Sequence, residues 1–389
     1  MSTRIAQRAL CLDDFEDMSR RHLPRPIFGY VAGATERNAA LADSARAFTE
    51  WGFVPRVLRD VSQRSFKTTL FGHEWAAPFG LAPMGLSALA AYRGDIVLTE
   101  AAAAANVPMI LSGSSLIRME EVIAANPNTW FQAYLPGDST RVEALVDRVA
   151  AAGFGTLLLT VDTAVLPNRE NNVRNGFSTP LKPSLRLAMD GIMHPSWSIN
   201  TFLRTWQRHG MPHFENSFAE RGAPILAKNV ERDFTARDHL NWEHLALIRK
   251  RWPGWLVVKG VMHPDDAARS AAEGADGIIV SNHAGRQLDG TSAPLRVLPE
   301  IAAASGEMAV MLDGGVRRGT DILKALALGA HFVFVGRPML HAAAVAGKPG
   351  VDRAIALLMG ELHRNMALLG VNGLDEIGPQ CLIRVGGPA

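Results

Sequence analysis

A histidine and an arginine stand three residues apart, at His283 and Arg286, in a segment that reads SNHAGRQLDG. The segment follows the apolar run 277–280, which is typical of a buried strand in a parallel sheet. Histidine titrates near neutral pH, and arginine binds a carboxylate through a planar fork of N–H donors. The pair therefore suits a substrate that loses a proton or hydride beside a carboxylate. An isolated pair of this kind is more often a solvated surface loop, so its meaning depends on the residues that the fold places around it.

Eight short β-rich runs, this one included, alternate with helical patterns. The runs lie at 78–82, 108–111, 129–134, 156–161, 255–258, 277–280, 309–312 and 331–335. Amphipathic or alanine-rich stretches lie between most of them, at 95–105, 138–152, 242–251, 264–273 and 319–328. This alternation predicts an α/β fold, the (β/α)8 or TIM barrel, whose active site forms at the carboxyl ends of the strands.

Two segments depart from the alternation. Residues 10–50 are predicted to form a helical, mostly peripheral N-terminal extension. A long insertion lies between the fourth strand and the fourth helix, within about 163–254, and is far longer than a strand-to-helix loop needs. We expect residues 1–389 to form a single domain, with the insertion folded onto the barrel.

Polar residues follow six of the predicted strands, so the barrel would bring them to one mouth. The glycine pair after the seventh strand and the Gly-Arg pair after the eighth lie where such barrels commonly bind phosphate. We therefore expect a phosphorylated cofactor or substrate. The residues at the strand ends are Gln132, Tyr134, Thr160, Asp162, Lys259, His283, Arg286, Asp313, Gly314, Gly315, Arg317, Gly336 and Arg337.

Lys259, at the end of the fifth strand, has three interpretations. It could form a Schiff base, as in an aldolase or a pyridoxal phosphate enzyme. It could place a fixed positive charge against a flavin ring, or it could form a structural ion pair. The residue types and spacing leave these alternatives open. No His-x-His or clustered carboxylate set occurs at the strand ends, so no metal site is predicted.

Composition limits the class of protein. The chain has 389 residues, 48% of them apolar, and a formal net charge of +2, which does not argue for nucleic acid. No run of eighteen apolar residues occurs, and the N-terminus is polar, so we expect a cytoplasmic protein without a membrane span. Cys11 and Cys381 are the only cysteines, too few for a disulfide framework.

Several motifs together resemble the FMN-dependent L-2-hydroxy acid oxidase/dehydrogenase family, which includes glycolate oxidase, L-lactate dehydrogenase and (S)-mandelate dehydrogenase. The resemblance spans essentially the whole chain, and segments 190–198 and 208–212 are most similar to the bacterial mandelate and lactate dehydrogenase branch. It implies an FMN cofactor, oxidation of a small L-2-hydroxy acid to the 2-oxo acid, and a homotetramer. Its most specific motifs lie at 130–134, 159–163, 281–289, 313–321 and 324–330.

Carried over position by position, the resemblance makes His283 the base that takes a proton from the substrate and Asp162 its partner. Arg286 and Arg169 would clamp the substrate carboxylate, while Tyr30 and Tyr134 donate further hydrogen bonds. The cofactor would be held by Pro83, Met84, Gly85, Ser112, Gln132, Thr160, Lys259, Ser281, Asp313, Gly315, Arg317, Gly336 and Arg337.

The chain departs from the family pattern at a few positions. Ala284 stands where the family usually has glycine, Met84 replaces a frequent threonine or valine, and Gly29 precedes Tyr30 where an acid or histidine is common. None of these changes removes a catalytic group. They bear on substrate choice, and the C–H bond could break by hydride transfer or through a carbanion.

The electron acceptor is predicted from the insertion and from Gly85 beside the ring, which favour a membrane quinone; the alternative is a soluble oxidase that reduces O2 to H2O2. Segment 177–215 is predicted to touch the inner face of the cell membrane peripherally, and the alternative is a lid or subunit contact. Its proposed apolar side chains are Trp197, Ile199, Phe202, Leu203 and Trp206, and its proposed cations are Lys182, Arg186, Arg204 and Arg208.

Overall fold

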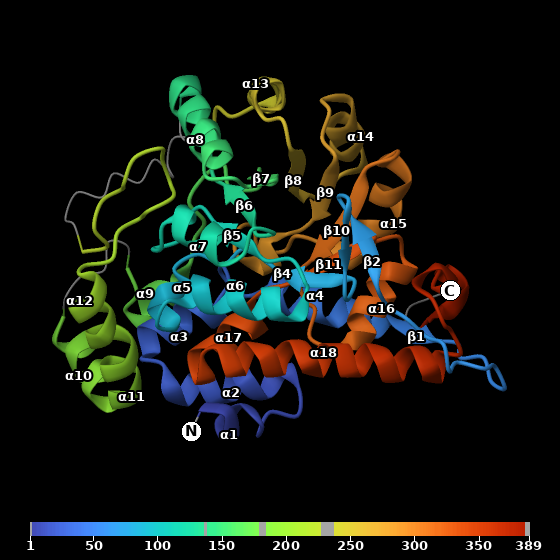
Figure 1. Ribbon diagram of the computed structural model, residues 1–389, viewed down its shortest axis with the longest axis horizontal. Coiled ribbons are helices and arrows are strands. Elements are labelled where there is room, and N and C mark those ends of the chain that lie inside the picture. Colours follow the sequence, from blue (N-terminus) through green and yellow to red (C-terminus); the bar gives the residue numbers. More distant parts are fainter. Residues whose placement is uncertain (1, 136–137, 179–183, 227–236, 386–389) are drawn as a thin grey trace.

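Eight parallel strands form a barrel that helices surround, as predicted (Figure 1). The structure is a computed structural model that describes residues 2–135, 138–178, 184–226 and 237–385. The eight predicted runs, from 78–82 to 331–335, each overlap one barrel strand, and the strands at 108–111, 255–258 and 309–312 extend one to three residues further. In chain order the barrel strands are β4 (Phe79–Leu81), β5 (Ile110–Ser112), β6 (Trp130–Ala133), β7 (Thr156–Thr160), β8 (Trp255–Val261), β9 (Gly277–Val280), β10 (Ala309–Asp313) and β11 (Phe332–Val335).

The barrel closes between its first two strands. The ladder runs β4-β11-β10-β9-β8-β7-β6-β5, and a parallel bridge between Leu81 and Met109 joins the ends. Most strand residues are buried on both faces, because helices cover the outside and side chains fill the inside. The strands therefore read as continuous apolar runs in the sequence.

The helices between the strands include all five that the sequence predicts. The sequence pattern did not predict α5, α7, α15 and α17. The long α18 packs against α17, which in turn packs against α2 (Figure 1). The barrel helices are α5 (Ser87–Ala90), α6 (Gly94–Ala105), α7 (Met119–Ala125), α8 (Ser139–Ala151), α13 (Trp242–Arg251), α14 (Pro264–Ala272), α15 (Pro294–Ala304), α16 (Gly319–Ala327), α17 (Arg337–Ala346) and α18 (Lys348–Leu369).

A hairpin closes the amino-terminal end of the barrel. It consists of β2 (Thr68–Leu70) and β3 (His73–Trp75), paired antiparallel. Phe71 at its turn stacks on Trp255 with ring centroids 5.1 Å apart and also contacts Trp130 at 5.4 Å. Side chains fill the barrel interior next to this hairpin as a packed core, and a cavity opens at the opposite end of the barrel.

The N-terminal extension is less peripheral than predicted. Leu12 and Phe15 are almost completely buried on the side of α2 that packs against α17, and α3 carries Tyr30 to the mouth of the barrel. The first and last strands pair antiparallel through Trp51 and Arg384. The elements at the two ends of the chain are α1 (Ser2–Ala6), α2 (Leu12–His22), α3 (Arg25–Ala32), α4 (Ala39–Arg46), η1 (Ala47–Glu50), β1 (Trp51–Phe53), η5 (Leu374–Glu376), η6 (Pro379–Cys381) and β12 (Leu382–Arg384).

The insertion forms a helical hairpin at the side of the barrel, at the lower left of Figure 1. The expectation that Trp197 belongs to its exposed apolar face is wrong. Trp197 is only 8% exposed, and its indole N–H donates to the carbonyl oxygen of Leu89 at 2.7 Å, so it anchors the hairpin to α5. The insertion contains α9 (Glu170–Asn175), α10 (Leu185–Met193), α11 (Pro195–Trp197), η2 (Ser198–Leu203) and α12 (Arg204–His209).

Candidate active site

A cavity of about 540 Å³ opens at the carboxyl ends of the barrel strands. This volume is ordinary for a site that holds a small molecule or cofactor. Its wall combines residues from the N-terminal extension, from the ends of the eight barrel strands and from the insertion, so widely separated parts of the chain build it. The predicted residues in this wall are Tyr30, Pro83, Met84, Gly85, Tyr134, Thr160, Arg169, Lys259, His283, Arg286, Asp313, Gly315, Arg317, Gly336 and Arg337.

His283 is held by Asp162. Its Nδ1 lies 3.1 and 3.2 Å from the two carboxylate oxygens, which leaves Nε2 for the cavity. Burial lowers the pKa of His283 below its ordinary value although Asp162 acts to raise it, so the ring is neutral at neutral pH. Burial opposes ionisation of Asp162, yet the histidine keeps the pKa of this carboxyl low. A neutral imidazole oriented by a carboxylate is suited to accept a proton.

The backbone around this pair is unusual. Three consecutive residues, His283, Ala284 and Gly285, have φ of 55°, 50° and 74°, a conformation that non-glycine residues rarely adopt. Gly260 has φ of 105°, and a Cβ there would lie 2.7 Å from the Cβ of Asp162. Gly260 therefore lets the carboxylate approach the histidine. The sequence analysis missed it, although a glycine directly after a strand-end lysine is the signal that could have found it.

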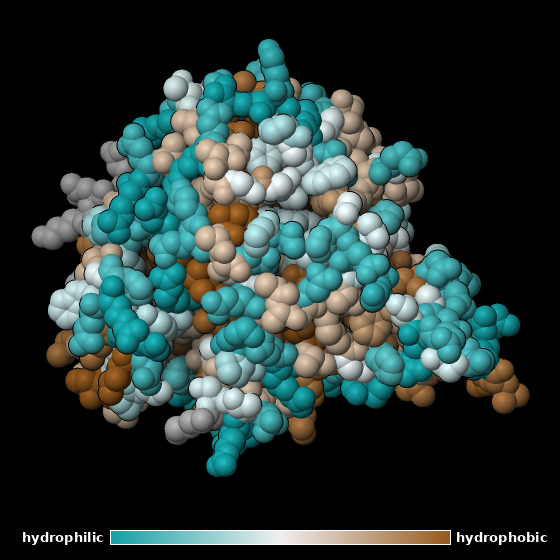
Figure 2. Space-filling model, viewed as in Figure 1, coloured by the Kyte–Doolittle hydropathy of each residue, from teal (hydrophilic) through white to brown (hydrophobic). Residues whose placement is uncertain are grey.

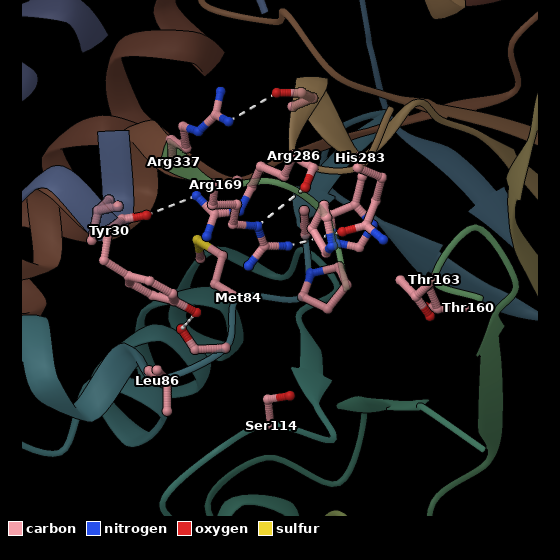
Figure 3. A pocket seen from close by; sticks show the side chains of 18 of the residues that line it. Tyr30, Met84, Leu86, Ser114, Thr160, Thr163, Arg169, His283, Arg286 and Arg337 are labelled. Atoms are coloured by element: carbon pink, nitrogen blue, oxygen red, sulfur yellow. Dashed lines mark hydrogen bonds between the residues drawn. The ribbon is translucent and has the colours of Figure 1, made fainter. Parts of the chain in front are cut away.

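Two guanidinium groups lie between Tyr30 and His283 (Figure 3). Arg286 donates to the carbonyl oxygens of Tyr30 and Gly33 at 2.7 and 2.8 Å. Arg169 donates to the carbonyl of Arg286 at 3.1 Å and to the side chain of Gln287 at 2.8 Å. These bonds fix both planes, and planar forks held in place can bind a carboxylate in a defined orientation.

Lys259 is a buried ion-pair partner. Its ammonium lies 3.0 Å from Asp313 and donates to Ser281 at 2.8 Å. Burial would lower its pKa, but Asp313 and Asp162 hold the pKa of the ammonium above its ordinary value. A protonated lysine is a poor nucleophile, so this environment does not suit the Schiff-base alternative. It suits a fixed positive charge in the cavity wall.

Buried polar atoms without partners surround the cavity, within the part of the chain that the structure describes. They are Nε2 of Gln132, Oγ1 of Thr160, Oδ1 of Asp313 and Nε of Arg337. Such atoms normally find a hydrogen-bond partner, because leaving one buried and unpaired costs about 1–3 kcal/mol. Donors and acceptors in this arrangement fit the polar edge and the ribityl chain of a flavin mononucleotide.

The far end of the cavity is cationic. Burial and the charges of Arg286 and Arg317 lower the pKa of the Arg337 guanidinium, as expected for a site that an anion completes. Arg337 donates to the carbonyl of Ala284 at 2.8 Å (Figure 3). At Gly315, φ is 84° and a Cβ would lie 2.2 Å from the carbonyl oxygen of Ser44, so only glycine fits there. These residues would hold a phosphate group.

Four predicted residues lie behind the wall of the cavity rather than in it: Ser112, Gln132, Asp162 and Ser281. Ser112 donates to Gln132 at 3.1 Å, and Ser281 accepts both from Lys259 and from the backbone N–H of His283. Ser281 therefore links the lysine to the histidine loop. The wall also contains Phe177 and Arg237, which the sequence analysis missed.

The fold and this site together are those of a barrel enzyme with a cationic, anion-binding pocket and a buried histidine–aspartate pair. The comparisons with known proteins are specific. Residues 19–384 match the model of the FMN-dependent dehydrogenase family. The chain therefore belongs to this family and is an FMN-dependent 2-hydroxy acid dehydrogenase or oxidase.

Among its relatives, (S)-mandelate dehydrogenase of Pseudomonas putida is 34% identical over 97% of this chain and 95% of the relative. L-lactate dehydrogenase of Caulobacter sp. (strain K31) is 38% identical over 95% and 97%. A solved structure described as the monotopic membrane protein (S)-mandelate dehydrogenase superposes with a TM-score of 0.89 at 34% identity, covering 97% of this chain and 100% of the neighbour. Mandelate oxidase superposes with a TM-score of 0.80 at 32% identity, with 98% and 100% covered.

Proposed function

We propose that the protein oxidises a lactate- or mandelate-like L-2-hydroxy acid and delivers the electrons to a membrane quinone. The observation that carries the first part is the neutral His283, oriented by Asp162, beside the fixed guanidinium planes of Arg286 and Arg169. FMN, when bound, accepts the two electrons that leave the substrate. The rest of the chemistry belongs to residues of the chain.

In this proposal Arg286 and Arg169 bind the substrate carboxylate and so place the hydroxylated carbon beside His283. His283 takes a proton from the substrate through Nε2, and Asp162 stabilises the imidazolium that forms. Tyr30 and Tyr134 donate hydrogen bonds to the substrate. Apolar side chains of the insertion, Leu166 and Phe177, also line the cavity and cover its substrate side.

The test of the oxidation is a spectrum of the purified protein followed by anaerobic addition of a panel of L- and D-2-hydroxy acids. We expect flavin absorbance, release of FMN on acidification, and bleaching by L-enantiomers only. Full bleaching by D-enantiomers, or none by any 2-hydroxy acid, would contradict the proposal.

Electron delivery to a membrane quinone is supported by an apolar face on the insertion, formed by eight exposed side chains of α10, η2 and α12. On α10 they recur at positions i, i+4, i+7 and i+8, and on η2 and α12 at i, i+3, i+4 and i+7, so each helix presents one apolar stripe. These stripes are exposed, and brown side chains gather over α10 and α11 in Figure 2. The exposed fractions are Leu185 80%, Met189 59%, Ile192 75%, Met193 75%, Ile199 59%, Phe202 47%, Leu203 38% and Trp206 58%.

An exposed apolar stripe of this kind on a soluble surface marks a contact with lipid or protein. Exposed Arg204 and Arg208 flank it, with the Arg204 guanidinium over the ring of Tyr92, and could meet anionic headgroups. Lys182 lies outside the described residues, as does the side chain of Arg186. Among the described helices none is long and apolar enough to cross a bilayer. We therefore propose that the protein binds the inner face of the cell membrane peripherally.

Mandelate oxidase among the structural neighbours supports the second candidate, a soluble oxidase that uses O2. The two are separated by reoxidation: a dehydrogenase reacts faster with a quinone analogue than with dissolved oxygen. A homotetramer also stays a prediction, and light scattering of the purified protein tests it.

A further inference from the structure

Arg237 lies in the wall of the active-site cavity, yet the chemistry above does not use it. It is 6% exposed, and its Nε donates to the carbonyl oxygen of Leu135 at 3.1 Å. It also lines a second cavity of about 190 Å³ between β7, β8 and α13, so it forms part of the partition between the two spaces. Placing a guanidinium this deep is costly unless the structure uses its charge or its donors.

The guanidinium covers the ring of Tyr134. Its Cζ lies 4.8 Å from the ring centroid, and Tyr134 itself lines the active-site cavity. A cation over an aromatic face is attracted by the ring quadrupole, more strongly in a site sheltered from water than at the surface. Burial raises the pKa of the Tyr134 phenol and Asp162 adds to this, whereas the Lys259 and Arg237 charges act in the opposite direction. Arg237 therefore makes the hydroxyl a stronger hydrogen-bond donor.

We propose that Arg237 is a positioning residue for Tyr134: it holds the ring in the cavity wall and polarises its hydroxyl toward the substrate. The proposal rests on the proposed function, in which Tyr134 donates a hydrogen bond to the substrate. Fixed donors aimed at developing charge stabilise a transition state more than a ground state. Arg237 then contributes to the rate of the chemical step and little to substrate binding.

The test is a double-mutant cycle on the holoenzyme with Arg237→Met, Tyr134→Phe and the double variant. Methionine keeps much of the apolar stem of Arg237 and removes the charge. Two quantities are measured: the rate of anaerobic flavin reduction at saturating substrate, and the Kd of the 2-oxo acid product. Arg269→Met is the matched control, because Arg269 lies over Trp242 at the same 4.8 Å on the outside of the barrel.

We expect Arg237→Met to slow flavin reduction about 3- to 30-fold, which is the cation–π range expressed as a rate, and to leave the product Kd within about twofold. In the Tyr134→Phe background the same change should have no further effect, since residues that act through each other are not additive. Arg237→Lys should restore part of the rate, and Arg269→Met should leave it unchanged.

Two outcomes overturn the proposal while leaving the proposed function intact. In one, Tyr134→Phe slows flavin reduction, but Arg237→Met slows it by the same factor in the Tyr134→Phe background as in the wild type. In the other, Arg237→Met weakens product binding without slowing the reaction, which makes Arg237 a substrate ligand. A full-rate Tyr134→Phe variant would instead remove Tyr134 from the proposed function. If Arg237→Met fails to retain FMN, Arg237→Gln, which keeps a donor for Leu135, takes its place with the same expectations.

Discussion

The mouth of the barrel and the insertion use their residues in opposite ways. At the mouth, ionisable side chains are buried and paired: Lys259 with Asp313, and His283 with Asp162. In the insertion, apolar side chains such as Ile192 and Trp206 are exposed. Both arrangements are costly in isolation, and in a folded protein such costs are retained where a ligand or partner offsets them. In the proposed function the two regions have different partners, a small anion at the mouth and a lipid surface at the hairpin.

The helical hairpin α10–α12 and the loop of His283 are attached to the rest of the molecule at different places. Trp197 anchors the hairpin to Leu89 on α5, whereas His283 lies on a loop after β9 that hydrogen bonds attach to the N-terminal extension. Thr35 donates to the carbonyl of Gly285 at 2.9 Å, and Asp289 accepts from the backbone of Ala40 at 2.8 Å. Changes in one region should therefore leave the other intact, and the following predictions test that independence.

The largest expected effect is at the base. His283→Gln should retain FMN and product binding but slow flavin reduction by about 10²–10⁴-fold, the usual contribution of a positioned general base. Stopped-flow reduction under anaerobic conditions measures it. Liposome binding should be unchanged, since the loop lies away from the hairpin. A near wild-type reduction rate would show that His283 is not the base.

The apolar face comes next. Replacing Ile192, Phe202 and Trp206 together by serine should lower partitioning onto anionic liposomes about 100-fold. Burying each apolar side chain in the bilayer contributes about 1 kcal/mol or more to the free energy of binding. Flavin reduction by a soluble substrate should not change. Co-sedimentation measures the first quantity, and stopped flow the second.

The matched control for the apolar face is the loop after β1, which projects at the lower right of Figure 1 and ends in a brown tip in Figure 2. Val57 and Leu58 on this loop are 80% and 104% exposed. Replacing both by serine removes exposed apolar surface far from the hairpin, so liposome binding should persist. Equal loss in both variants would mean that the binding is not specific to the insertion.

The carboxylate clamp gives an effect of similar or smaller size. Arg286→Met or Arg169→Met should raise the Kd of a 2-oxo acid about 10- to 100-fold, as expected for the loss of hydrogen bonds to a charged group. Lysine should restore little, since it offers a point charge in place of a fork. Titration of the oxidised holoenzyme measures the Kd. Equal activity on 2-hydroxy acids and their neutral amides would refute the clamp.

The pH dependence is set by the histidine and aspartate pair. Because burial lowers the pKa of His283 below the ordinary 6.5, kcat/KM should stay level through neutral pH and fall only on acidification below 6.5. Asp162→Asn removes the charge that raises this pKa, so the acidic limb should move to still lower pH while the rate drops.

The free energy of unfolding should also decrease on acidification. Both groups have lowered pKa values in the folded state, so the unfolded chain binds more protons and the free energy of unfolding decreases as pH falls. For Asp162 this loss occurs as pH drops through its folded pKa, and for His283 in the window below 6.5. If Asp162→Asn instead moves the acidic limb of the kcat/KM profile to higher pH, the pairing of Asp162 with His283 is contradicted.

The smallest effect concerns strain beside the base. Ala284 adopts φ of 50°, and an alanine in the left-handed region costs about 1 kcal/mol relative to glycine. Ala284→Gly should therefore raise the free energy of unfolding by up to about that amount, offset in part by the greater freedom of the unfolded chain. Urea denaturation measures it. A destabilised variant would mean that the alanine methyl packs productively at the mouth.

The sequence by itself determined the barrel and most of its site. Parallel strands buried on both faces must be apolar runs, and the crossover between them must hold a helix, so the alternation is visible without coordinates. Because all strands of such a barrel end at one mouth, residues such as His283 and Lys259 could be brought together from their places after strands. The resemblance of several motifs to a known family then indicated FMN as the cofactor.

Only the tertiary structure decided what depends on contacts between distant segments. Phe71 covers the amino-terminal end of the barrel by stacking on Trp255. The sequence of a short hairpin does not show which distant residue its turn will contact. Trp197 reads as one more exposed aromatic, but its indole reaches a carbonyl on α5. Arg237 lies within the long insertion, away from any strand end in the sequence, yet the fold places its guanidinium over the ring of Tyr134. Periodicity records which face of an element is apolar, whereas burial and pairing between elements arise when the chain closes on itself.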